Sequence, residues 1–593
     1  MMNLLLVLFL TGNVFAADDA WTDWYRHGFV KSILKLREIR IELEKKNLHD
    51  PHVKYPNSVP CDSKTLTTRT IDGTCNDLNQ TLMGAKGMRL GRNIPLAYGH
   101  TVEEEILEPN PRLISLELLT RKEFKPVPFL NLLATSWIQF MTHDWFSHGK
   151  NEETEPFFLK LPDGDPFNQK DMMVQRSKFD LTRTEEDKVL PITFTNEVTH
   201  WWDGSQLYGS DLETSNKLRT FQNGLLKVTD SGLLPVDDDG LELTGFKENW
   251  WIGLSLIHHL FTLEHNTIAR HLKQNYPNWN DQKLFDTSRM INAAVMAKIH
   301  TVEWTPAILP NKTLKTGMNA NWKGLLNPTG GVRWPLEIQT DPVLSGIVGG
   351  KRNLHGVPYS MTEEFVSVYR MHPLLPESIE LRSVTSGRHL KTIAIKDTRN
   401  EQSPEIISTH GLSNLFYSFG VAHPGQLVLN NFPNFMQELD IPVIGKIDLG
   451  AVDIIRDRER GVPRYNQFRR LVGLKPIKKF EELNPDLELT NKIKRVYKGD
   501  VEKLDLMIGS FAEGYRPTGF GFGETSFQIF IIQASRRLQA DRFFTTDYTA
   551  KVYTKEGLRW IDAATMKNVF LRHFPELAPK LSDVKNAFNP WKK

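Results

Sequence analysis

A tyrosine and a histidine stand three residues apart in the segment SVYRMHPLLPE, residues 367–377. A neutral imidazole is a good axial ligand for haem iron. If His372 held iron in this way, Tyr369 would lie within electron-transfer distance and could be oxidised to a phenoxyl radical that abstracts hydrogen from a substrate. The spacing predicts that both side chains share one face of a helix. The alternative is that both are helix-end residues satisfied by local hydrogen bonds.

A second group of reactive side chains occurs in WIQFMTHDWFSHG, residues 137–149. Gln139 and His143 are four residues apart, so a helix would place them one turn apart on the same face. An imidazole in that position could act as an acid–base group above a cofactor. Asp144 points to a different face, where its carboxylate could hold a hard cation. A solvated polar patch beside a core histidine is the competing interpretation.

Oxygen-bearing residues alternate in VTHWWDGSQLYGSD, residues 198–211. Thr199, Asp203 and Ser205 offer side-chain oxygens, and the backbone carbonyl of Trp201 falls between them. Oxygen ligands in a short glycine-containing loop suit Ca²⁺, with Asp144 as a remote fifth ligand. Without Asp144, the same residues would form an ordinary turn stabilised by side-chain to backbone hydrogen bonds.

Helical periodicity dominates the rest of the 593-residue chain. No sustained alternating strand pattern and no internal repeat occurs, and no connector is biased enough to separate domains. The sequence therefore predicts a mainly α protein with a single large helical domain and few short strands. The expected long helices cover 21–47, 128–146, 249–274, 281–309, 363–371 and 525–544.

Composition limits the partners and the compartment. The net charge of +2 gives no electrostatic reason to expect binding to nucleic acid.

The N-terminus has the features of a signal peptide. Its apolar run is too short to span a bilayer, and VFA before ADDA is typical of a cleavage site. We therefore expect a signal peptide at 1–17, export, and a mature domain at 18–593. In an exported chain Cys61 and Cys75 form either one disulfide or two buried thiols. The segment 21–48 could contact a membrane, although charges on most faces favour a plain surface helix.

Several segments together resemble the haem peroxidase–cyclooxygenase superfamily. QFMTHDW and EEFVSVYRMHPLLPE are accompanied, in the same order, by TRTIDGTCNDLNQTLMGAKGMRLGRNIP, WWDGSQLYGSD, FTLEHNTIARHL and DLGAVDIIRDRERGVPRYNQFRRLVGL. Within the superfamily, QFMTHDW, AKIHTVEWT, VYRMHPLLP and ASRRLQADRFFT resemble the fatty-acid α-dioxygenases. The resemblance runs from about residue 60 to 545. It implies a haem-peroxidase-like helical domain that adds O₂ to the α-carbon of long-chain fatty acids.

The resemblance also implies roles for individual residues. His143 would be the distal histidine with Gln139 beside it, His372 the iron ligand and Tyr369 the radical-forming tyrosine. The substrate carboxylate would be held by His300, Thr305 and Arg537, although Arg536 is adjacent and could exchange places with Arg537. The calcium ligands would be Asp144, Thr199, Trp201 through its carbonyl, Asp203 and Ser205.

Two departures from the peroxidases concern the haem. The interval 220–269 contains no arginine where peroxidases carry a catalytic distal arginine, and Thr142 replaces the aspartate through which oxidising peroxidases attach haem. Both favour non-covalent haem b and feeble peroxidase turnover. The expected reaction therefore uses a trace of hydroperoxide as activator, with a fatty acid and O₂ as substrates. The remaining alternatives are a cyclooxygenase-like enzyme attacking mid-chain carbons, a general haem peroxidase, and a non-catalytic haem-binding protein.

Overall fold

Helices are the predominant regular secondary structure of the protein. The computed structural model describes residues 23–593 apart from 152, 327–340, 442–443 and 518, so the expected signal peptide lies outside the described residues. The α-helices of seven or more residues are α2 (Phe29–Lys46), α4 (Leu133–Trp145), α6 (Leu212–Leu218), α7 (Ile252–Asn275), α8 (Asp281–Ile299), α10 (Lys312–Lys323), α13 (Gln402–His410), α14 (Leu412–Val421), α15 (Leu449–Glu459), α16 (Tyr465–Leu471), α17 (Leu487–Val496), α18 (Leu506–Ala512), α19 (Glu524–Gln539), α20 (Ala550–Ala563) and α21 (Met566–His573).

Short elements connect these helices. The short α-helices are α3 (Pro111–Ile114), α5 (Ser205–Tyr208), α9 (Thr305–Ile308), α11 (Pro342–Ser345), α12 (Glu363–Val368) and α22 (Ala578–Leu581). Three antiparallel two-stranded sheets pair β1 (Phe157–Lys160) with β2 (Asp171–Val174), β3 (Ser378–Arg382) with β4 (His389–Ala394), and β5 (Leu439–Ile441) with β6 (Gly445–Ile447). The prediction of a mainly α fold with few short strands is confirmed.

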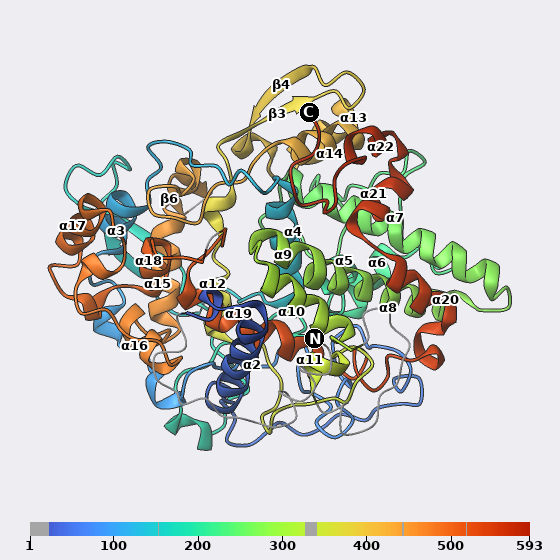
Figure 1. Ribbon diagram of the computed structural model, residues 1–593, viewed down its shortest axis with the longest axis horizontal. Coiled ribbons are helices and arrows are strands. Elements are labelled where there is room, and N and C mark those ends of the chain that lie inside the picture. Colours follow the sequence, from blue (N-terminus) through green and yellow to red (C-terminus); the bar gives the residue numbers. More distant parts are fainter. Residues whose placement is uncertain (1–22, 152, 327–340, 442–443, 518) are drawn as a thin grey trace.

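Helix α4 lies at the centre of the molecule, packed against α7, which in turn packs against α8 (Figure 1). Eleven of its thirteen residues are buried, and Gln139 and Thr142 are the two that are not fully buried. A helix that is apolar on nearly all sides must lie inside the core. The functional residues predicted on this segment are therefore held by a rigid, interior element.

The expected helix at 281–309 is interrupted. Helix α8 ends at Ile299, a π-helical turn covers His300–Trp304, and α9 follows. The amide N–H of Thr305 donates to the carbonyl oxygen of His300, five residues earlier. Pro306 has no N–H with which to continue an α-helical ladder, so the wider turn accommodates it.

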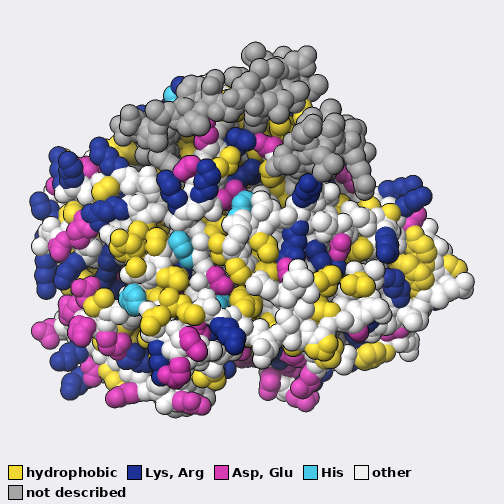
Figure 2. Space-filling view, turned by 90° about the horizontal axis from the view of Figure 1, so that it is seen from below, with side chains coloured by type: hydrophobic (Ala, Val, Ile, Leu, Met, Phe, Trp, Pro, Cys, Tyr) yellow, Lys and Arg dark blue, Asp and Glu magenta, His cyan; other side chains and the backbone are white. Residues whose placement is uncertain are grey.

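The other expected helices are shorter at their ends than the patterns predicted. Helix α2 begins at Phe29 after Gly28, and α19 ends at Gln539. Ile33, Ile39 and Leu43 on α2 are buried against the protein. Among the described helices, none has both the length and the apolar composition needed to cross a bilayer. Acidic and basic side chains are interspersed on the face of the molecule that Figure 2 shows.

Cys61 and Cys75 form a disulfide, which answers the alternative left open by the sequence. The loop that it closes packs against the segment expected to bind calcium. The carbonyl oxygen of Gly73 accepts a hydrogen bond from the indole nitrogen of Trp201 at 3.0 Å. The disulfide therefore restrains a loop that supports that segment.

Candidate active site

A cavity of about 420 Å³ lies between α4 and the segment after α12. Gln139 and His143 reach it from α4, and Tyr369 and His372 reach it from the following segment. These two pairs come from parts of the sequence more than 200 positions apart, and the structure brings them to one place as expected. The volume falls within the range of cofactor and small-molecule sites.

Tyr369 and His372 do not share one helix face, contrary to the sequence-based expectation. Helix α12 ends at Val368, Tyr369 forms its C-cap, and a separate 3₁₀ turn begins at His372. Pro373 has no N–H to donate to the carbonyl oxygen of Tyr369 four residues earlier, so an α-helix cannot continue through this segment. Both side chains nevertheless line the cavity, so the bend changes their relative orientation without separating them.

The imidazole of His372 is oriented by a carboxylate. Its Nδ1 lies 2.8 Å from Oδ2 of Asp453 on α15, so Nδ1 is the donor and Nε2 is left to bind a metal. Burial acts to raise the pKa of Asp453, but the neighbouring His372 and Arg370 hold it below its usual value. The residues present fit a haem whose iron is bound by His372, because a carboxylate behind the imidazole is the usual support of such a ligand.

The imidazole of His143 lies in an apolar environment. The ring of Phe246 is 4.6 Å away between centroids, and burial lowers the pKa of His143 to about 3. A neutral imidazole can accept a proton from a bound peroxide. Oε1 of Gln139 accepts a hydrogen bond from the indole of Trp251 at 2.8 Å, so this amide is held by the protein.

The guanidinium of Arg537 is buried without a counter-ion. Its Cζ lies 3.7 Å from the ring centroid of Trp145 and 4.4 Å from that of Trp202. None of its three nitrogens has a hydrogen-bond partner among the described residues. Aromatic faces offset part of the cost of burying this cation, but five donors remain available. The shape and charge of the group suit a carboxylate ligand.

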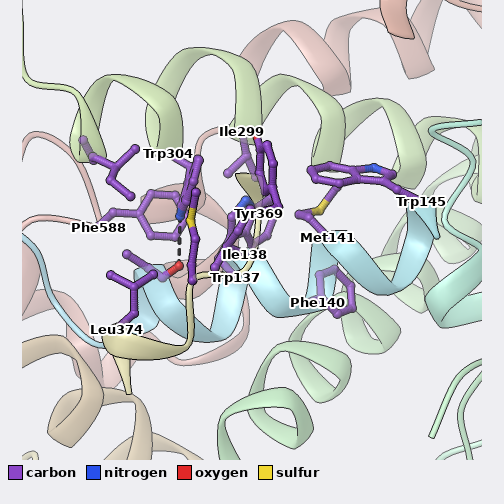
Figure 3. Packing of buried hydrophobic residues seen from close by; sticks show 14 of the residues in the cluster. Trp137, Ile138, Phe140, Met141, Trp145, Ile299, Trp304, Tyr369, Leu374 and Phe588 are labelled. Carbon is purple, nitrogen blue, oxygen red and sulfur yellow. Dashed lines mark hydrogen bonds between the residues drawn. The ribbon is translucent and has the colours of Figure 1, made fainter. Parts of the chain in front are cut away.

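Three further buried polar atoms have no partner in the described structure: Nε2 of His300, Oγ1 of Thr305 and Oη of Tyr369. The ring of Trp145 contacts those of His300 and Tyr369 at 5.2 and 5.9 Å between centroids. Figure 3 shows the packing along α4, with Trp145, Tyr369 and Trp304 among the residues drawn. His300, Arg537 and the predicted radical site Tyr369 therefore meet around Trp145, and Thr305 follows His300 at the end of the π-helical turn.

The tautomer of His300 follows from its neighbour. The indole nitrogen of Trp137 donates to Nδ1 of His300 at 3.2 Å. An indole is a donor only, so Nδ1 is the acceptor and the neutral ring carries its proton on Nε2. Burial, and then the charge of Arg537, lower the pKa of His300 well below its usual value. His300 therefore presents a neutral N–H donor to the cluster.

The structure distinguishes the two adjacent arginines. Arg536 donates to the carbonyl oxygens of Leu354, Val357 and Pro358 at 3.3, 3.0 and 2.8 Å. These bonds fix a neighbouring loop and occupy the guanidinium. Only Arg537, of the two, is free to bind a ligand.

The segment Thr199–Ser205 converges with Asp144. The backbone N–H of Ser205 donates to Oδ1 of Asp144 at 2.6 Å and to Oδ1 of Asp203 at 3.1 Å. Burial, and then the charge of Asp203, raise the pKa of Asp144. Oδ2 of Asp144 has no partner in the described structure. Two buried carboxylates at one point, with hydroxyl oxygens of Thr199 and Ser205 beside them, fit a hard divalent cation.

The surroundings of Asp144 and Asp203 do not form a metal site made of carboxylates alone. Nη2 of Arg289 lies 3.2 Å from Oδ2 of Asp203 and offsets part of its charge. In the described part of the chain, no three His, Cys, Asp or Glu side chains gather as metal ligands. A cation at this position would depend on two carboxylates together with neutral oxygens.

Sequence reasoning missed Asp453, Trp145 and Phe246. Asp453 and Asp457 stand four residues apart on α15, so they share one face of that helix, and acids that a helix buries need a partner. Trp145 directly follows the predicted residues His143 and Asp144. No local signal identifies Phe246, because its contact with His143 depends on the tertiary fold.

Comparisons with known proteins identify relatives over most of this chain. The family model for animal haem peroxidases matches residues 68–588. Alpha-dioxygenase 2 of Arabidopsis thaliana is 40% identical, over 91% of this chain and 86% of its own length. Alpha-dioxygenase PIOX of Oryza sativa is 37% identical, over 97% and 94%. The crystal structure of Oryza sativa fatty acid alpha-dioxygenase with palmitic acid superimposes with a TM-score of 0.90, covering 100% of this chain and 96% of that one at 36% identity.

Proposed function

We propose that this chain, which belongs to the α-dioxygenase branch of the animal haem peroxidase family, adds O₂ to the α-carbon of long-chain fatty acids. The observation that carries the proposal is the cluster of unpartnered buried polar groups at Arg537, His300, Thr305 and Tyr369. Three of these groups are donors, and a fatty-acid carboxylate would satisfy them together. The complex of the rice enzyme with palmitic acid supports the substrate class.

The binding step follows from the donors. Arg537 offers a charged fork to the carboxylate, and Nε2–H of His300 and the hydroxyl of Thr305 each add a hydrogen bond. Tyr369 lies within the same cluster, so a head group held there presents its adjacent carbon to the phenolic oxygen. Holding the reacting atoms together in this way supplies much of the rate acceleration in oriented reactions.

Non-covalent haem b, bound through His372, would supply the one-electron oxidant for Tyr369 after activation by a trace of hydroperoxide. His143 would move the proton of that peroxide as an acid–base group, with Gln139 beside it. Asp453 would keep the proton of His372 on Nδ1. The packing of Phe246 against His143 fills space with an apolar ring rather than an arginine, which favours slow peroxidase turnover.

The oxygenation itself uses Tyr369. Burial raises the pKa of the phenol, so the group remains protonated before oxidation. After losing a proton and an electron, Tyr369 takes one hydrogen atom from the α-carbon. O₂ adds to the resulting carbon radical, and the peroxyl radical recovers a hydrogen atom from Tyr369. The product is a 2-hydroperoxy fatty acid, which can lose CO₂ and water to give an aldehyde one carbon shorter.

Calcium at Asp144, Thr199, Trp201, Asp203 and Ser205 would fix the end of α4. A cation there neutralises two buried carboxylates next to the helix that carries His143. The ion would therefore act on the position of α4 and take no part in the reaction.

Export of the mature chain is part of the same proposal. The bond between Cys61 and Cys75 supports an oxidising compartment, because such bonds persist outside the cytosol. Determination of the N-terminus of the protein recovered from its host checks this point. A mature chain that begins near residue 18 is expected, and an intact Met1 would refute cleavage.

The decisive experiment measures oxygen consumption by the haem-loaded protein given palmitic acid, with products identified by mass spectrometry. Wild type is expected to form the 2-hydroperoxide or the shortened aldehyde, and Tyr369→Phe to form neither while keeping its haem spectrum. Tyr359→Phe is the matched control, because that buried tyrosine stacks on Trp201 and donates to the carbonyl oxygen of His200. Oxygenation at a mid-chain carbon, or none at all, would refute the proposal.

A further inference from the structure

A second, narrow cavity of about 70 Å³ lies apart from the one between His143 and His372. Its walls come from α2, α10 and α19, and α2 packs against both of the other helices (Figure 1). The lining is mostly apolar, with Ile33, Leu36, Leu314, Met318, Phe530 and Ala534 among its members. No residue of the catalytic cluster lines it.

Two of these walls lead directly from the carboxylate cluster. Ala534, Phe530 and Phe527 precede Arg537 on α19 by three, seven and ten residues, so all four lie along one face of the helix. At the rise of an α-helix this stripe extends about 15 Å from Arg537. Helix α10 begins shortly after α9, whose first residue is Thr305.

Phe530 joins the two regions. Its ring lies 6.4 Å from that of Tyr369 between centroids, with the planes 19° apart, and the same side chain lines the second cavity. One aromatic ring therefore lies between Tyr369 and the cavity formed by α2, α10 and α19.

A glycine in the wall of the cavity has no structural need to be glycine. Gly317 lies in the interior of α10, where glycine is less favourable than alanine because it loses more backbone freedom on folding. A Cβ added to Gly317 would meet no protein atom within 4 Å. The space beside it belongs to the cavity, so the missing side chain widens the cavity at a cost in helix stability.

We infer that this cavity receives the hydrocarbon tail of the fatty acid and that Gly317 sets the length of tail that fits. The inference rests on the proposed function, because the tail is placed by a carboxylate at Arg537. Under that function, the unpaired guanidinium fixes where the head group lies relative to the cavity. Burying one further methylene is worth about a fourfold change in kcat/KM.

The test compares Gly317→Leu with wild type on decanoic, myristic, palmitic and stearic acids. Gly317→Leu is expected to leave kcat/KM for decanoic acid within about twofold and to lower it for stearic acid by roughly tenfold or more, as two or more methylenes lose their site. Leucine favours helix over glycine, so α10 is expected to fold. Gly317→Ala should give the same trend with a smaller amplitude.

Asn319→Leu is the matched control, because Asn319 is exposed on the same helix and does not line the cavity. It is expected to keep the wild-type dependence on chain length. Equal losses on all four acids in Gly317→Leu, or an unchanged profile, would overturn the inference while leaving the proposed function intact. Absence of oxygen uptake by wild type on any acid would instead overturn the proposed function.

Discussion

Replacing Arg537 by methionine is expected to stabilise the protein and to weaken its action on fatty acids. The guanidinium is fully buried, has no ion partner among the described residues, and is held only by aromatic faces. Burial lowers its pKa, which shows that the surroundings disfavour the charge. The buried charge of Arg537 therefore costs the free protein stability. If the site is functional, a bound ligand offsets that cost.

The two effects can be given magnitudes. Replacing buried charges by apolar side chains of similar volume has stabilised proteins by about 1–4 kcal/mol. Hydrogen bonds to charged groups contribute about 1.5–3 kcal/mol each, so removing both bonds of a bidentate arginine–carboxylate pair weakens substrate binding by about 3–6 kcal/mol. The corresponding decrease in kcat/KM is roughly 100- to 10,000-fold.

The assay pairs thermal unfolding of the haem-loaded protein with oxygen uptake on palmitic acid. Arg537→Met should unfold at a higher temperature than wild type and show the decrease in kcat/KM. Arg536→Met is the matched control: it leaves the carbonyl oxygens of Val357 and Pro358 without the partner they have in the structure, so it should lower stability and preserve kcat/KM of the folded enzyme. A destabilised Arg537→Met with unchanged kcat/KM would refute the reasoning.

Three other changes test the surroundings of the site. Asp453→Ala should weaken haem binding by about 10- to 100-fold, measured by spectral titration, because His372 loses the acceptor that orients it; unchanged binding would contradict this role. Asp144→Asn should reduce bound calcium, measured by metal analysis, and a chelator should lower the melting temperature of wild type only. The pKa of Glu303 is raised to about 7 by burial, so this carboxyl binds its proton more tightly in the folded state than in the unfolded one. The contribution of Glu303 to stability should therefore fall as pH rises from 4.5 to 7, so the free energy of unfolding of wild type relative to Glu303→Gln should decrease over that range.

The interior helices could be predicted because their signal is local. The period of apolar residues placed α4, α7 and α19 to within a few residues. The predicted helix ends were less accurate than the predicted helix centres. They depend on the backbone effects of Gly28, Pro306 and Pro373, which the period of apolar residues does not reveal.

The site could be predicted only through resemblance. His300, Tyr369 and Arg537 lie far apart in sequence, and no periodicity indicates that they meet around Trp145. The choice between Arg536 and Arg537 shows the same limit. Adjacent residues on a helix point about 100° apart, so their identical side chains are distinguished only by the carbonyl groups or aromatic rings that the fold places beside each.

The π-helical turn determines how the side chains of His300 and Thr305 are placed relative to each other. Five residues of α-helix would place Thr305 about 140° around the axis from His300. The wider turn instead bonds Thr305 N–H to the carbonyl oxygen of His300, so the two residues lie one above the other. Both then carry buried donors without partners in the described structure, Nε2–H and a hydroxyl. Unpaired donors are costly in an apolar core, and a carboxylate removes that cost for both of them and for Arg537 at once. The same irregularity that interrupts the helix therefore places two of the proposed carboxylate donors one above the other.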